Sequence, residues 1–194
     1  MTDGVGRPVA VLTAATLLTA VYGVTADSPF TWIYVTITVV LAALVGLIHA
    51  VMPLSARAAW ALVAAAIINL AGGVLLVDGQ PLYVLALWGD FRFDKPAHLV
   101  ATGLAAFAVF DVVAPRFDAA TNLLTARIVA VLVACGLGAL VEIVEFVGTL
   151  VVENANVGDY GNNMADLVAN LAGAILAMPL MRFGPDRVPF KDPT

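Results

Sequence analysis

The chain has 194 residues, of which 62% are hydrophobic and only 12% are charged. A soluble domain carries about 45–50% apolar and about 25% charged residues, so a soluble globular domain, a disordered chain and a disulfide scaffold are excluded. The net charge of −5 argues against a nucleic-acid partner. The single Cys135 excludes an intrachain disulfide and is interpreted as a small packed hydrophobic residue. An integral membrane protein, with the lipid bilayer as its partner, is the class that remains.

Six apolar segments are long enough to cross a bilayer as helices, because a span needs about 20 residues. None shows the alternation of a strand, so an all-α, polytopic membrane helix bundle is predicted, as a single membrane domain over residues 1–194. The expected spans are residues 9–26, 32–52, 57–77, 97–114, 127–150 and 164–181. The first span, between Arg7 and the small residues Val24 to Ala26, also fits a cleaved signal peptide, in which case five spans remain.

The positions of lysine and arginine predict how the spans are oriented. Seven of the nine fall in the N-tail, the second loop, the fourth loop and the C-tail. Positive charge marks the cytoplasmic side. Both termini, including the tail at 183–194, are therefore expected in the cytoplasm of a multi-pass protein of the cell membrane.

The third loop, residues 78–95, is expected outside and at the membrane interface. Its apolar stretch from Pro81 to Trp88 is too short to span. Trp88, Phe91 and Phe93 suit the headgroup level. Either a short interfacial helix or an ordinary packed loop is consistent with this stretch.

Polar residues converge near the outer face in the second half of the chain. His98 lies about one turn into span four, Glu142 and Glu145 lie in the outer half of span five, and Asp166 and Asn170 enter span six from the same side. Glu142 and Glu145 are three residues apart and share one helix face. Scattered polar residues would not be expected at one depth, so these side chains predict a site.

The charges of this site need compensation. Two carboxylates one turn apart cannot both stay ionised in a membrane without it. Lys95, a protonated His98, a metal cation or a shared proton could supply it. Asp94 adjoins Lys95 and alternatively caps span four. The polar residues Gly158 to Asn163 are expected to fill the last loop.

One imidazole with several carboxylates suits a divalent cation, with zinc, manganese or iron favoured over magnesium or calcium. The candidate ligands are His98, Glu142, Glu145, Asp159 and Asp166. A hydrogen-bond network that only holds three helices together is the alternative. His49 lies at the inner end of span two and is interpreted as structural or as snorkelling to the membrane surface.

These motifs resemble the YjdF-type membrane proteins, a family of unknown function, and more distantly the VanZ-like proteins. The matching residues are Phe93-Asp94-Lys95 with His98, Glu142-x-x-Glu145-Phe146, Gly158-Asp159, Asn162-Asn163 and Asp166-Leu167. The resemblance covers about residues 90–175, the motif-bearing half, and implies a small helical membrane bundle. One departure is Asn162, where the family pattern usually has an acidic residue.

Three functions fit the sequence. In a metal-dependent enzyme acting on a lipid or lipid-linked substrate, Glu142 or Glu145 would be the general base. His98 would then be an acid, base or ligand, and Lys95 would bind a headgroup phosphate. Asp94, Asn163 and Asn170 would orient the other groups. A small-solute or ion-coupled transporter is the second function, although the two halves show no repeat. A structural or accessory protein is the third.

Overall fold

The computed structural model describes residues 4–116, 123–151 and 160–182. Six long helices make up most of this part of the chain. They are α1 (Gly6–Thr25), α2 (Thr31–Val51), α3 (Ala56–Val74), α4 (Asp94–Val113), α5 (Leu123–Val151) and α6 (Tyr160–Leu176). Each is long and apolar enough to cross a membrane, α6 together with the 3₁₀ turn that follows it to Leu180. This confirms the predicted six-span helix bundle and a multi-pass membrane protein.

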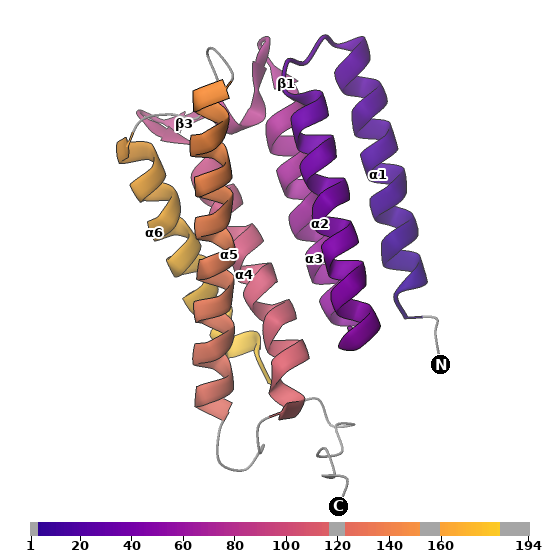
Figure 1. The fold of residues 1–194 in the computed structure, drawn as a ribbon. Helices are drawn as coiled ribbons and strands as arrows, with labels where there is room; N and C mark the ends of the chain where they lie inside the picture. Colours follow the sequence, from indigo (N-terminus) through magenta and orange to yellow (C-terminus); the bar gives the residue numbers. More distant parts are fainter. Residues whose placement is uncertain (1–3, 117–122, 152–159, 183–194) are drawn as a thin grey trace, which may run out of the picture.

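The helices form two groups of three, as Figure 1 shows. The first group is α1 to α3 and the second is α4 to α6, and the contact between α3 and α4 joins them. Helix α4 is the centre of the bundle, since it packs extensively against α3, α5 and α6. The second group carries the polar residues.

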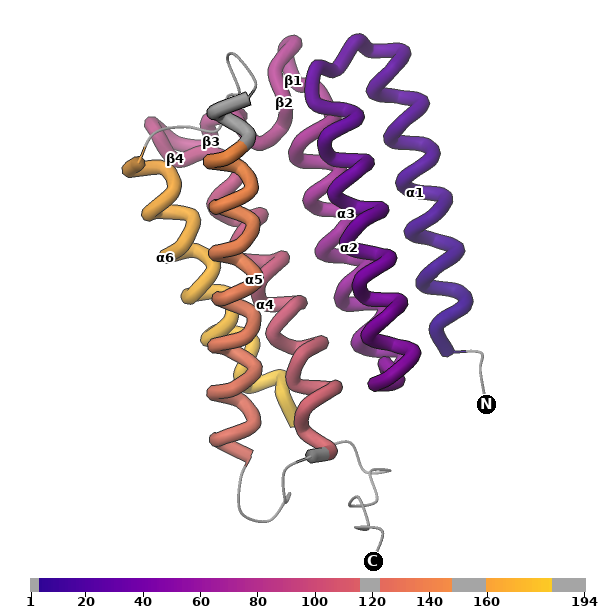
Figure 2. Tube along the Cα trace, viewed as in Figure 1, coloured from indigo at the N-terminus to yellow at the C-terminus, as the bar shows by residue number. Residues whose placement is uncertain are grey.

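The two ends of the bundle differ (Figure 2). The loop between α3 and α4 lies at the end opposite to the start of α1 and the end of α6. We call this the hairpin end, after the two β-hairpins that the loop contains. The prediction that the hairpin end faces outward rests on the charge distribution and stays a prediction.

Small residues make the helix contacts in the core. Alanines dominate the buried cluster between α4, α5 and α6, where Phe110 and Met181 are the largest members. A second cluster between α3 and α4 is built on Ala58, Ala61 and Ala108. Lipid is as apolar as leucine, so close backbone approach drives helix association in a membrane.

Helices α4 and α6 pack closely because glycines, which have no side chain, lie at their contact. A Cβ built on Gly173 would collide with the backbone of Leu99, and one on Gly103 would lie 3.0 Å from the carbonyl oxygen of Gly173. This close packing holds the first half of α4 against α6 and thereby positions the polar residues on both helices.

The sequence left two alternatives for the third loop, and the structure has the packed loop in place of the interfacial α-helix. It consists of β1 (Leu76–Val77), β2 (Gln80–Pro81), the 3₁₀ turn η1 (Leu82–Val84), β3 (Ala86–Trp88) and β4 (Phe91–Arg92). Asp78 and Gly79 both have positive φ, 52° and 78°, and close the first hairpin. A two-residue Asp-Gly loop favours such a hairpin. Gly89, with φ 55°, lies between β3 and β4.

Two helices begin earlier than the hydrophobic pattern indicates. Helix α4 begins at Asp94 instead of residue 97, and α6 begins at Tyr160 instead of residue 164. Residues 160–163 are therefore helical, although the sequence placed them in the last loop. Polar residues can begin a membrane helix here because neighbouring polar groups satisfy them. Residues 152–159 of that loop lie outside the described part of the chain.

At the opposite end, polar contacts connect α2, α3 and α4. Arg57 at the start of α3 pairs with the buried Asp111 near the end of α4, with Nη2 and Oδ1 3.3 Å apart. The Nδ1 atom of His49 accepts a hydrogen bond from the backbone N–H of Leu54, in agreement with its structural interpretation. Ser55 caps α3 by accepting from the N–H of Ala58.

Candidate functional site

The candidate site lies inside the second helix group, toward the hairpin end. His98 lies about one turn into α4, Asp166 lies in the second turn of α6, and Glu142 comes from α5. At 1.5 Å per residue, all three lie within roughly 15 Å of the ends of their helices. The sequence prediction that these residues meet at one depth is consistent with this placement.

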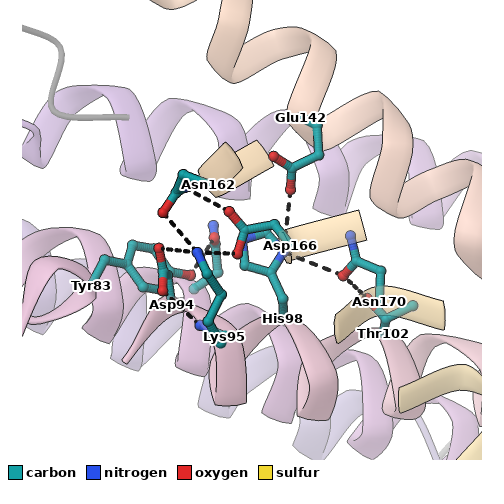
Figure 3. A network of polar contacts seen from close by, with 10 residues as sticks. Tyr83, Asp94, Lys95, His98, Thr102, Glu142, Asn162, Asp166 and Asn170 are labelled. Atoms are coloured by element: carbon teal, nitrogen blue, oxygen red, sulfur yellow. Dashed lines mark hydrogen bonds and ion pairs between the residues drawn. The ribbon is translucent and has the colours of Figure 1, made fainter. Parts of the chain in front are cut away.

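His98, Glu142 and Asp166 converge closely enough to share one ion. One ligand atom from each residue lies within 4.8 Å of the other two. Nδ1 of His98 is 3.4 Å from Oε1 of Glu142, and Nε2 of His98 is 3.9 Å from Oδ1 of Asp166. Glu142 is 5% exposed and Asp166 is 1% exposed. Figure 3 shows the three side chains pointing toward one another.

Asn170 and Thr102 fix one edge of the His98 ring. The Oδ1 atom of Asn170 lies 3.3 Å from Nδ1 of His98 and accepts a hydrogen bond of 2.5 Å from the hydroxyl of Thr102. In the tautomer that has its proton on Nδ1, this nitrogen donates to the amide oxygen of Asn170. Nε2 is then unprotonated, and its lone pair lies on the side of Asp166. Metal-binding histidines commonly have such a partner on the second nitrogen.

Lys95 is held by three oxygen atoms. Its Nζ atom is 2.9 Å from Oδ2 of Asp94, 2.8 Å from Oδ1 of Asp166 and 2.7 Å from Oδ1 of Asn162. Asn162 in turn donates to Oδ2 of Asp166. An ammonium has three donors, so a headgroup phosphate could bind Lys95 only if one of these contacts opened. In this arrangement Lys95 and Asn162 position the carboxylate of Asp166.

The charges of the site favour a further cation. Asp94, Glu142 and Asp166 contribute three carboxyl groups to the site. Among the described residues, Lys95 contributes the ammonium group that opposes their charge. Glu145 adds a half-buried carboxyl group one turn along α5. Burial of unbalanced charge is costly, and a divalent cation or bound protons would reduce the excess.

The sequence analysis missed three residues near the site, one from the third loop and two from the first helix group. Tyr83 from η1 stacks near His98, and its hydroxyl donates to Oδ1 of Asn69 on α3. Tyr34 of α2 packs against the Tyr83 ring. Burial, followed by Tyr34 and the negative charges of the site, raises the pKa of Tyr83 well above its ordinary value, so the phenol remains a donor.

The other candidate residues divide into three groups. Asn170 contacts His98 and Lys95 contacts Asp166, whereas Asp94 contacts Lys95. The orienting role of these three residues stays a prediction. Glu145 is not in the group that could share an ion, and Asn163 is half-buried outside the cluster contacts, both within the described residues. Asp159 lies outside the described part of the chain. Its role as a ligand stays a prediction.

We expect an alanine at Gly138 to disturb Asn170. A Cβ there would lie 2.7 Å from Nδ2 and 2.9 Å from Cγ of Asn170. Overpacking of this kind should lower the free energy of unfolding by about 1–3 kcal/mol. Gly136→Ala on the same helix is the matched control, because its Cβ would meet nothing within 4 Å. Thermal unfolding in detergent measures both, and equal midpoints for the two variants would contradict the expected contact.

Comparison with known proteins identifies the family of the chain. The family model described as "Predicted membrane protein (DUF2238)" matches residues 7–187. This agrees with the YjdF-type resemblance and extends it over the first spans, whereas the VanZ-like resemblance gains no support. No match was found among curated proteins or among solved structures. The chain therefore belongs to the DUF2238 family of membrane proteins, which is the YjdF family.

Proposed function

We propose that the protein is a metal-dependent membrane enzyme that acts on a lipid or lipid-linked substrate. His98, Glu142 and Asp166 would hold one divalent cation between α4, α5 and α6. A borderline cation such as Zn²⁺ suits one imidazole and two carboxylates. When bound, it would polarise a substrate oxygen or activate a water molecule.

The carboxylate of Glu142 is the observation that carries this proposal. Its Oε2 atom is buried and has no hydrogen-bond partner among the described residues. Buried polar atoms in a network that serves only to hold helices together are normally satisfied. A carboxylate oxygen left without a donor, beside an imidazole and a second carboxylate, is what an ion site requires.

The depth of the site favours a lipid substrate. Two of the three proposed ligands, His98 and Asp166, lie four and six residues after the first residue of their helices. At 1.5 Å per residue they are roughly 6 and 9 Å from the hairpin end, in spans that cover about 30 Å of hydrocarbon. The ester and phosphate groups of lipids lie near the ends of such spans. Glu145 is outside the proposed ligand set and nearer the hairpin end, so it is the residue that we propose as general base.

Metal binding tests the first half of the proposal. We expect purified protein, stripped with a chelator and titrated with Zn²⁺, to bind one equivalent and to unfold at a higher temperature. At 100 times the dissociation constant, the stabilisation should reach about 2.7 kcal/mol. Glu142→Gln should lose most of this shift. Asp111→Asn, which changes another buried carboxylate at the opposite end, should keep it. An unaltered shift in Glu142→Gln would overturn the site.

Lipid turnover tests the second half. The protein is placed in nanodiscs of phosphatidylethanolamine and phosphatidylglycerol, and mass spectrometry follows the lipids with and without Zn²⁺. A zinc-dependent change that Glu145→Gln and Glu142→Gln both abolish supports the enzyme. Stoichiometric zinc without any lipid change would contradict action on these lipids and favour the transporter or structural alternatives.

A further inference from the structure

We infer that Tyr83 is a positioning residue, which fixes the imidazole plane of His98 from outside the helix group that carries the proposed ligands. The inference deepens the proposed function and rests on it, because the ring that Tyr83 orients belongs to a proposed ligand. Tyr83 comes from the 3₁₀ turn between the two hairpins. A loop residue would thus set the geometry of a site whose proposed ligands come from three spans.

The contact between the two rings is direct. The centroids of Tyr83 and His98 are 6.4 Å apart, and the ring planes differ by 27°. Offset stacking of aromatic rings falls within this range of distances. Asn170 contacts the edge of the imidazole at Nδ1, while the Tyr83 ring stacks beside it. Together they restrict the direction in which Nε2 points.

The ring of Tyr83 is itself held on several sides. Its hydroxyl donates to Oδ1 of Asn69 over 2.9 Å, and the ring of Tyr34 packs at a centroid distance of 5.8 Å. Space for the two tyrosine rings comes from two adjacent glycines on α3. A Cβ on Gly72 would collide with Tyr83, and one on Gly73 would collide with Tyr34. Because the Tyr83 ring is packed so tightly, it limits the orientations that the neighbouring His98 ring can adopt.

The chain offers a direct spectroscopic test, because it contains only two histidines. His49 lies at the end of α2 and serves as an internal reference. With isotope-labelled histidine, NMR reports the imidazole nitrogen signals of His98 and His49 separately. These signals respond strongly to the proton and the hydrogen bond at each nitrogen, respond only weakly to the ring current of a neighbouring aromatic side chain, and do not require bound metal. They report the contact between Nδ1 of His98 and Asn170, which the placement of the imidazole ring sets and which a loss of stability alone would not shift.

Tyr83→Leu should move the His98 signals, leave those of His49 in place and weaken Zn²⁺ binding about tenfold. Tyr83→Phe retains the aromatic ring and should keep both the signals and the affinity close to wild type. Gly72→Ala displaces the same ring without changing its chemistry, and it covers the case in which Tyr83→Leu does not fold. Its matched control is Gly46→Ala, whose Cβ would meet nothing within 4 Å.

Unmoved His98 signals in Tyr83→Leu or in Gly72→Ala would overturn the positioning role, whatever the metal affinity. A shift in Tyr83→Phe as large as that in Tyr83→Leu would overturn it too, since the ring would then not be the cause. Absence of Zn²⁺ binding in the wild-type protein would instead refute the proposed function, while the His98 signals would still decide whether Tyr83 positions this ring.

Discussion

Gly173→Ala should unfold the second helix group or force α4 and α6 apart. The new Cβ would collide with the carbonyl group of Leu99, which is backbone and has no rotamer to change. We expect a loss of about 3 kcal/mol or more in the free energy of unfolding, at the upper end of overpacking effects. Any surviving folded protein should show altered His98 signals, because Asp166 and Asn170 move with α6.

Gly136→Ala provides the comparison for this variant. It makes the same chemical change in a membrane helix where the Cβ meets nothing within 4 Å. Alanine is favoured over glycine in a helix by up to about 1 kcal/mol, so this control should be neutral or slightly stabilised. Denaturant titration in mixed micelles measures both. Unchanged stability of Gly173→Ala would show that α4 and α6 do not pack as closely as described.

Lys95→Met should be the most damaging change in the polar cluster itself. It removes the ammonium that lies within 2.9 Å of Asp94 and within 2.8 Å of Asp166, and leaves both carboxylates without their counter-ion. Removing one partner of a buried ion pair costs about 3–5 kcal/mol. The same denaturant titration should show a loss of that size.

A double variant separates the electrostatic cause from a packing cause. Lys95→Met combined with Asp166→Asn removes one of the stranded charges and should recover part of the loss. Arg7→Met removes a positive charge from an exposed position on α1 and should change stability by less than about 0.5 kcal/mol. A double variant less stable than Lys95→Met alone would mean that charge is not what Lys95 balances.

The spans were predictable because a membrane helix is recognised from the hydrophobicity of about 20 consecutive residues. Over a segment of this length, single polar or turn-forming residues have little effect on the mean. The third loop was not. Its conformation depends on single turn positions such as Asp78 and Gly79, whose positive φ values decide between a hairpin and a helix. The apolar stretch after Pro81 suggested a helix because its hydrophobicity was the stronger signal.

The site was partly predictable for a related reason. His98, Glu142 and Asp166 are conspicuous because charged or titratable groups are rare within spans. Thr102 was missed although it lies four residues after His98 and therefore on the same helix face. Asn69 was missed as a single polar residue in an apolar span. Tyr83 carries no such signal, since only the folded loop brings it to His98.

The two ends of α4 have different partners, and this has a mechanical consequence. Near its start Lys95 is tied to Asp166 of α6, and near its end Asp111 is tied to Arg57 of α3. Sliding α4 along its axis would therefore break both ion pairs at once. Helix α4 is thus held in axial register from both ends, by a different neighbouring helix at each end.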